Sequence, residues 1–187
     1  MLADSSLTCR CAVDVRIACA RTRRTCECVP VVTGPTLVII SGLPGSGKTT
    51  LATQLANDRP GVRLCPDDWM AALGADIWDS DFRERVERFQ QTLVAELLRC
   101  GTTAIIEWGT WAREERERLR HVAVGVGART ELVVLDPPLE TLWERVVVRG
   151  LEDPPMRRED LEGAYEFFQR PDDEEAVTYD LFTYIDH

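Results

Sequence analysis

Residues 41–50 read Ser-Gly-Leu-Pro-Gly-Ser-Gly-Lys-Thr-Thr, and they stand between an apolar stretch and a helix-forming one. The apolar stretch, residues 36–41, is short and rich in β-branched side chains, which predicts a buried parallel strand. Residues 48–56 predict a helix that ends at the turn-forming residues 57–61. The glycine-rich segment is therefore expected to be the turn that leads from a strand into a helix.

This segment matches the phosphate-binding pattern Gly-x-x-x-x-Gly-Lys-Thr in full. Glycines let backbone N–H groups converge on phosphate oxygens, and the start of the following helix adds a favourable dipole. The Lys48 ammonium fits between the outer phosphates, and the Thr49 hydroxyl is the expected Mg²⁺ ligand. We expect ATP and Mg²⁺ to bind here, through Gly42, Leu43, Pro44, Gly45, Ser46, Gly47, Lys48, Thr49 and Thr50. The alternative is a glycine-rich turn without a ligand.

Lys48 is the only lysine among the 22 basic residues of the chain; the other basic residues are all arginines. A GC-rich coding bias explains the excess of arginine but not the position of the one lysine. An ammonium is a compact point charge, whereas guanidinium is a wide planar fork. The position of this lysine therefore favours the phosphate-binding interpretation.

Strands and helices alternate along the rest of the chain. We expect strands at residues 62–65, 102–107 and 130–135 and within 177–185, and helices at 80–99, 112–124 and 160–168 and after Asp136. Asp136 is interpreted as a helix cap because prolines follow it. Ser80 is the expected cap of helix 80–99, whose apolar stripe is Phe82, Val86, Phe89, Leu93 and Leu97. This alternation predicts an α/β fold with a parallel sheet covered on both faces.

Composition limits the class of protein. A chain of 187 residues is long enough for one well-buried α/β domain. The net charge is -10, and residues 1–30 hold five arginines against three acidic residues, so residues 31–187 carry the negative charge. An acidic body disfavours a long nucleic-acid partner. No apolar run approaches 18 residues, so we expect no membrane span.

Residues 1–35 show no sustained periodicity, and they contain five of the seven cysteines. Their spacing matches no standard zinc pattern, and the apolar stretch at residues 12–20 is broken by charges, unlike a signal peptide. We interpret residues 1–35 as a disordered, Cys/Arg-rich leader and residues 36–187 as the organised domain. Cys65 and Cys100 are expected to be buried small residues, and a cytoplasmic location suits this cysteine pattern.

Two classes of phosphate-binding protein are excluded by the sequence. A guanine-reading Asn-Lys-x-Asp motif is impossible because there is no second lysine. The hydrolysis signature of motor proteins, four apolar residues followed by Asp-Glu, is also missing. A small kinase remains the favoured class.

Three further motifs follow the glycine-rich loop: Pro66-Asp67-Asp68-Trp69, then Ile105-Ile106-Glu107-Trp108-Gly109-Thr110-Trp111, then Arg145-x-x-x-Arg149. With the loop, they resemble small P-loop kinases of the polynucleotide 5′-kinase, zeta-toxin and chloramphenicol phosphotransferase branch. The resemblance covers residues 36–186. It implies a three-layer P-loop NTPase fold with a five-stranded, mainly parallel sheet, similar to nucleoside and adenylate kinases, with a short lid.

The resemblance also implies roles for particular residues. Asp67 matches the carboxylate that accepts a proton from the substrate hydroxyl; Asp68 is the alternative base, and either could instead cap the turn. Arg145 and Arg149 match a pair that closes over the phosphates, so Arg145 joins Lys48 and Asp67 as a catalytic candidate; the alternative is a surface pair. The remaining acceptor-site candidates are Asp68, Trp69, Glu107, Trp108, Trp111 and Arg113. Glu107 could hold water or substrate, and the tryptophans could form an aromatic wall or pack in the core.

We therefore expect an ATP-dependent kinase that phosphorylates a hydroxyl of a small molecule. A polynucleotide 5′-hydroxyl kinase or toxin-like kinase would need a basic groove, which residues 36–187 do not suggest. A third hypothesis is a nucleotide-binding regulator that hydrolyses ATP slowly or not at all.

Overall fold

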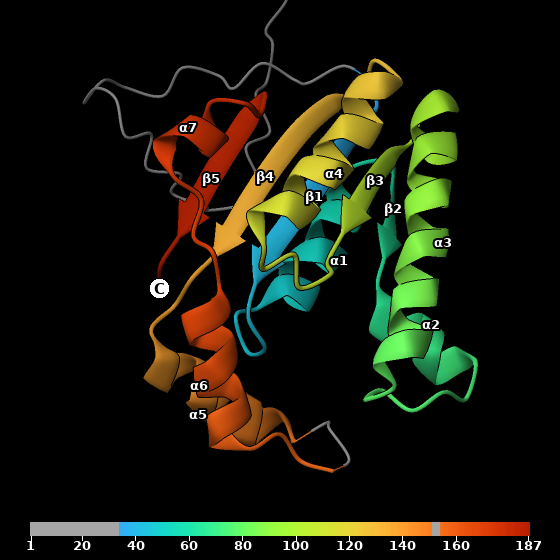
Figure 1. Cartoon of the computed structure of the whole chain (residues 1–187). Coiled ribbons are helices and arrows are strands. Elements are labelled where there is room, and N and C mark those ends of the chain that lie inside the picture. The colour runs from blue at the N-terminus through green and yellow to red at the C-terminus, as the bar shows by residue number, and fades with distance from the viewer. Residues whose placement is uncertain (1–33, 151–153) are drawn as a thin grey trace, which may run out of the picture. The chain divides into compact units, whose positions relative to one another are not determined.

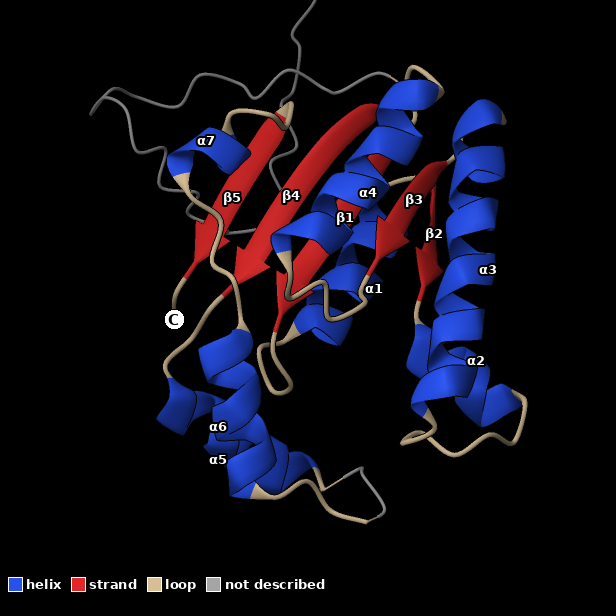
Figure 2. Ribbon diagram, in the orientation of Figure 1, coloured by secondary structure: helices blue, strands red, loops and turns tan. Residues whose placement is uncertain are grey.

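The computed structural model describes residues 34–150 and 154–187. These residues form one sheet of five strands, all parallel, in the order β2-β3-β1-β4-β5 (Figure 2). The strands are β1 (Thr36–Gly42), β2 (Gly61–Leu64), β3 (Thr103–Ile106), β4 (Arg129–Leu135) and β5 (Leu181–Ile185). The predicted α/β class and parallel sheet are confirmed. Residues 1–35 were interpreted as a leader, and residues 1–33 of this segment lie outside the described part of the chain.

Helices connect the strands, as the alternation predicted. They are α1 (Lys48–Asp58), α2 (Pro66–Ala72), α3 (Ser80–Arg99), α4 (Arg113–Gly125), α5 (Leu139–Arg149), α6 (Arg158–Phe167) and α7 (Asp173–Ala176). Helix α2 was not predicted, because Pro66 was interpreted only as the end of a strand. Proline is also a favoured first residue of a helix, and Pro66 occupies that position. The short helix α7 was also missed.

The sheet separates two apolar layers. Leu37 and Ile39 of β1 face the layer that contains residues of α3 and α4. Val38 and Ile40, which alternate with them, face α1. Figure 1 shows α3 and α4 on one side of the sheet and α1 on the other. Both faces of β1 are thus buried, which explains its continuous run of apolar residues.

Several connections meet at the carboxyl edge of the sheet. The loop between β1 and α1 leaves this edge, and α2, α5 and α6 lie beyond it (Figure 1). The region expected to form a lid lies between α5 and α6, and residues 151–153 of it are outside the described part. Ligands of open parallel sheets bind at the carboxyl edge, so this is where a site is expected.

Some local predictions were wrong. Helix α3 is capped by Asp79 rather than Ser80, since the Asp79 carboxylate accepts a hydrogen bond from Phe82 N. Asp136 caps no helix and instead accepts hydrogen bonds from Arg170 and Tyr184. Cys100 is exposed, and so is Phe89, which belongs to the predicted apolar stripe. No helix within the described ranges combines the length and apolarity that crossing a membrane requires.

Candidate functional site

The glycine-rich loop has the backbone shape of a phosphate cradle. Gly45 and Gly47 have φ angles of 81° and 99°, in the left-handed region that favours glycine. A Cβ on Gly47 would meet no atom within 4 Å, so the space above it is open to a ligand. A Cβ on Gly45 would lie 2.6 Å from the Leu142 carbonyl oxygen of α5, so helix α5 supports the loop from below.

Polar atoms of the loop are available to a ligand. The N–H groups of Gly45 and Gly47 have no acceptor among the described residues. These N–H groups fit a bound phosphate chain.

The Lys48 ammonium lies inside the same loop. Its Nζ donates to the Leu43 carbonyl oxygen at 3.0 Å. Burial lowers the pKa of Lys48 to about 8, while the charges of Glu107 and Asp67 act in the opposite direction. The carboxylates therefore help to keep the ammonium charged next to the cradle.

A cavity of about 450 Å³ opens beside the loop. Its floor contains Lys48 and Thr49, and its wall contains Asp67, Glu107, Trp108 and Trp111. The other residues that line it are Pro44, Pro66, Ile77, Trp78, Arg83, Glu87, Gln91, Gly109, Thr110, Glu115, Arg118, Leu119, Arg149, Met156 and Phe167. The volume suits a small molecule next to the end of a nucleotide's phosphate chain.

The two adjacent aspartates of α2 differ in environment. Asp67 lines the cavity, where Arg83 of α3 donates a hydrogen bond to it. Asp68 does not line the cavity and instead pairs with Arg63 of β2. Consecutive positions on a helix point in different directions, which explains why only one carboxylate faces the cavity.

Glu107 follows β3 and is almost completely buried at the cavity wall. Its Oε1 accepts from Arg63 Nη1 at 2.5 Å, whereas its Oε2 has no hydrogen-bond partner within the described ranges. Burial raises the pKa of Glu107, whereas the adjacent Cys65 thiol and the nearby charges of Arg63 and Lys48 lower it.

The described residues around the loop offer few ligands for a bound Mg²⁺. Thr49 is exposed at the cavity floor, so its hydroxyl can reach a cation held by phosphate oxygens. The described residues contain no group of three or more His, Cys, Asp or Glu side chains that could hold a metal. This arrangement suits an ion that arrives with the nucleotide, because Mg²⁺ keeps most of its ligands from phosphate and water.

The three predicted aromatic residues are divided between two places. Trp108 and Trp111 line the cavity, and Trp108 Nε1 donates to Gln90 Oε1 at 2.7 Å. Trp69 is not brought into the cavity; it packs on Phe89 of α3, with ring centroids 6.0 Å apart. Trp69 points away because it lies on a different face of the short helix α2 from Asp67.

The predicted arginines are also divided. Arg149 of α5 lines the cavity, whereas Arg145, one turn earlier, is exposed and is not part of the lining. Arg113 of α4 is likewise outside the cavity; it pairs with Glu117 and Asp172. Five of the predicted site residues therefore line the same cavity as the glycine-rich loop: Asp67, Glu107, Trp108, Trp111 and Arg149.

Several residues that line the cavity were not predicted from the sequence. Arg83, Glu87 and Gln91 lie outside the predicted apolar stripe of helix 80–99, on a face that a sequence pattern assigns to solvent. A helical pattern cannot distinguish a face that lines a cavity from one in bulk water. The only available signal was a charge complementary to Asp67 on a neighbouring helix.

Comparison with known proteins identifies the group to which this arrangement belongs. Residues 37–171 match the model of an AAA-domain family. The chain belongs to this AAA-domain family. The match begins in β1, extends through the glycine-rich loop and the whole cavity wall as far as α6, and ends before α7.

Several solved structures have a similar fold. A candidate kinase from Chloroflexus aurantiacus J-10-fl superposes with a TM-score of 0.65, at 22% identity over 81% of this chain and 88% of that one. A chain of the Pnkp1/Rnl/Hen1 RNA repair complex gives 0.64, at 23% identity over 81% of this chain and 48% of that one. The APS kinase CysC of Mycobacterium tuberculosis, in complex with AMPPNP and APS, gives 0.59, at 24% identity over 83% and 91%.

These similarities establish the fold. The chain has the three-layer architecture of P-loop kinases, so the resemblance drawn from its motifs is confirmed. The activity that this fold carries is a separate question, which depends on the residues of the cavity.

Proposed function

We propose that this AAA-domain protein is an ATP-dependent kinase that transfers the γ-phosphoryl group to a hydroxyl of a small molecule. One observation carries the proposal: Lys48 and Thr49 of the glycine-rich loop share one cavity of about 450 Å³ with the Asp67 carboxylate. A phosphate cradle and a proton acceptor in the same cavity are the two parts that transfer to a hydroxyl requires.

The chain's own residues supply most of the chemistry. The acceptor hydroxyl gives its proton to an Asp67 oxygen while its own oxygen bonds to the γ-phosphorus. The bond from that phosphorus to the β,γ-bridging oxygen breaks, and its electron pair leaves with ADP. Lys48 and Arg149 neutralise charge on the phosphate oxygens, and the backbone N–H groups of the loop hold them in line. Mg²⁺, when bound with the nucleotide at Thr49, offsets charge on the β- and γ-phosphates.

The environment of Asp67 supports its assignment as the base. Its carboxylate lines the cavity, and Arg83 holds it from the side of α3. Asp68, the other candidate, pairs with Arg63 and does not line the cavity. A base must lie within hydrogen-bond reach of the proton it accepts, so Asp67 is the better placed carboxylate.

A small acceptor agrees with the size and chemistry of the cavity. Its wall combines apolar rings, among them Trp78 and Phe167, with a few charged groups. The chain has a net charge of -10, which opposes binding of long polyanions. A polynucleotide 5′-hydroxyl kinase remains the alternative, so the test includes its substrate.

The test is transfer of label from γ-labelled ATP to pooled nucleosides, sugars, hydroxylated antibiotics and a 5′-hydroxyl oligonucleotide, with Lys48→Ala as the blank. We expect a labelled small product with the intact protein only. A labelled oligonucleotide would instead establish the alternative. Nucleotide binding without any labelled product in the whole panel would favour a regulator.

The same assay tests the base. With an accepted substrate, Asp67→Asn should lower kcat by about 100- to 10,000-fold, the usual contribution of general base catalysis. Asp68→Asn is the matched control, because it removes a neighbouring carboxylate that also pairs with an arginine. Equal losses in the two variants would contradict the assignment of Asp67.

A further inference from the structure

A tight turn separates β3 from α4 next to the cavity. The turn consists of Gly109, Thr110 and Trp111, and we call it the Gly109–Trp111 turn. Thr110 has a φ of 45°, the one positive φ found for a non-glycine residue in the described part of the chain. L residues rarely adopt this conformation, so surrounding contacts must hold it.

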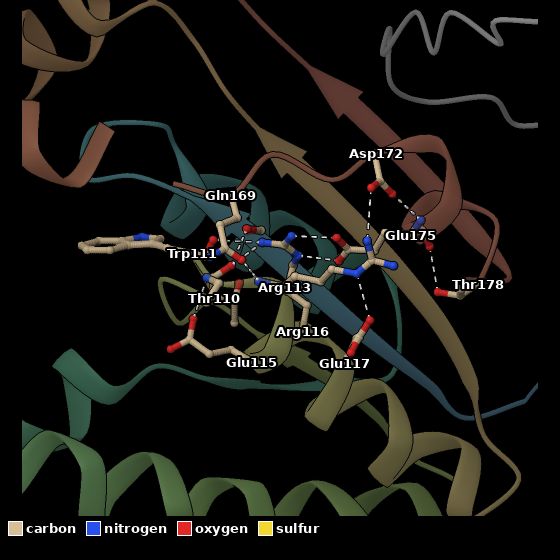
Figure 3. Close-up of polar contacts among 12 residues, drawn as sticks. Thr110, Trp111, Arg113, Glu115, Arg116, Glu117, Gln169, Asp172, Glu175 and Thr178 are labelled. Atoms are coloured by element: carbon tan, nitrogen blue, oxygen red, sulfur yellow. Dashed lines mark hydrogen bonds and ion pairs between the residues drawn. The ribbon is translucent and has the colours of Figure 1, made fainter. Parts of the chain in front are cut away.

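Four hydrogen bonds converge on two carbonyl oxygens of this turn. The Thr110 oxygen accepts from Ser41 Oγ at 2.9 Å and from Arg116 Nη1 at 3.1 Å. The Trp111 oxygen accepts from Arg116 Nη1 at 3.2 Å and from Gln169 N at 3.0 Å. Figure 3 shows the Arg116 side chain reaching the turn from α4.

The other side of the same guanidinium meets Glu175 of α7. Arg116 Nε and Nη2 donate to the two Glu175 oxygens at 2.7 and 2.8 Å. Both side chains are buried, with exposed fractions of 0% and 2%. A buried ion pair is seldom the most stable solution for a core, because both charges lose their hydration. The energetic contribution of this pair alone therefore does not explain its presence, and its contacts with the turn supply a positional role to test.

The turn contacts both the phosphate loop and the cavity. Gly42 N donates to the Gly109 oxygen at 3.4 Å, and Trp111 Nε1 donates to the Gly42 oxygen at 3.2 Å. A Cβ on Gly109 would lie 2.7 Å from Trp111 Nε1, so the indole folds tightly over the turn. The Trp111 side chain also lines the cavity. The position of the turn thus sets one wall of the acceptor pocket.

We propose that the Arg116–Glu175 pair is a positioning device for the acceptor wall. The pair fixes the Gly109–Trp111 turn, and through it the Trp111 indole, and it ties this wall to the segment 169–176 that follows α6. Its effect on turnover rests on the proposed kinase function, whereas its effect on Trp111 does not. Neither residue touches the cavity, so both act through the turn.

Two variants separate positioning from folding. Arg116→Lys keeps a positive charge beside Glu175, but its single nitrogen cannot replace Nε and Nη2 on Glu175 and Nη1 on the two turn carbonyls at once. Arg116→Met combined with Glu175→Leu replaces the pair by apolar side chains of similar size, an exchange that cores often tolerate. The control is Arg59→Met with Glu131→Leu. It removes a 2.6 Å ion pair between the end of α1 and β4, in which Glu131 is buried and Arg59 is 35% exposed.

The first readout needs neither ATP nor an acceptor. It is the quenching of tryptophan fluorescence by acrylamide. The contribution of Trp111 is obtained by subtracting the fluorescence of the same variant that also carries Trp111→Phe. We expect the quenching constant to rise at least about twofold in both Arg116 variants and to stay unchanged in the control. An unchanged constant in a folded Arg116 variant would overturn the proposal. If neither variant folds, the pair serves stability and the proposal is also overturned.

The second readout is the kinetics of transfer with an accepted substrate. We expect the acceptor KM to rise about tenfold in the Arg116 variants, and the ATP KM to rise by a smaller factor, because the turn also contacts Gly42 of the phosphate loop. Equal changes in both KM values would contradict a device specific to the acceptor wall. If the intact protein transfers no phosphate at all, the kinase function fails, but the quenching result still decides the role of the pair.

Discussion

Cys65 illustrates how a residue's surroundings decide its chemistry. It precedes Pro66 at the start of α2, and its side chain is buried at the carboxyl end of β2. Burial raises the pKa of Cys65 to about 12, and the adjacent Glu107 carboxylate acts in the same direction. Since the thiolate is the nucleophile, this cysteine is expected to be inert.

Alkylation of the native protein checks this expectation. At about pH 8, which is far below the raised pKa, only about one Cys65 side chain in ten thousand is ionised. Iodoacetamide should therefore modify Cys65 at least about 100-fold more slowly than the exposed Cys100, as measured by peptide mass spectrometry. Modification in urea, where burial is lost, is the control. Similar native rates at the two sites would show that Cys65 is accessible.

At the scale of elements, the glycine-rich loop depends on support from its neighbours. Gly45 packs against α5, so the loop has no room for a side chain at this position. Gly127 has a similar φ of 72°, compared with 81° at Gly45, but a Cβ there would meet no atom within 4 Å. Alanine substitutions at the two positions therefore distinguish the cost of a left-handed backbone from the cost of a steric clash.

Substitution of these glycines by alanine tests the packing of the loop. Gly127→Ala should cost about 1–2 kcal/mol of stability from left-handed strain alone. Gly45→Ala should cost more and should weaken ATP binding at least about tenfold, because the displaced backbone no longer presents its N–H groups. Thermal denaturation and calorimetric titration provide the two measurements. Equal effects of the two changes on ATP affinity would argue against a preformed cradle.

The sequence predicts the elements well wherever local pattern decides them. The strand–loop–helix unit around residues 36–58, the alternation of strands and helices, and the end of α3 before Gly101 all follow from apolar periodicity and turn residues. Helix α2 was missed because Pro66 can end a strand or begin a helix. The different directions of Asp67, Asp68 and Trp69 then could not be foreseen.

Contacts between segments that are far apart along the chain could not be predicted from the sequence. Arg116 and Glu175 are 59 positions apart, and each stands in a run of charged residues that predicts an exposed face. Arg83 and Glu87 belong to a similarly charged helix face that turns out to line the cavity. Charge patterns identify polar faces, but only the packing of elements shows whether water, a ligand or another side chain covers them.

At the scale of the whole molecule, the described core lies on both faces of the sheet. Its two apolar layers draw on residues from Leu37 to Ile185, with the sheet between them. The loop and the cavity wall come from this same range. The expectation that residues 36–187 form the functional domain therefore remains a prediction with a direct test.

Removal of residues 1–33 provides that test. We expect a shortened protein whose Tm lies within about 2 °C of the full chain, because residues 1–35 show no sustained apolar periodicity. Its ATP affinity should be unchanged within about twofold. Circular dichroism and titration of both proteins make the comparison. A large loss of either property would assign a structural or binding role to the first 33 residues.

Calorimetric titration of the full chain with ATP and magnesium tests the central claim most directly. We predict saturable binding at one site and a loss of at least about tenfold in affinity in Lys48→Ala, as expected for removal of a charge-assisted contact. Absence of both heat and thermal stabilisation at millimolar ATP would contradict the account. So would undiminished affinity in the variant, since the ammonium would then lie outside the nucleotide site.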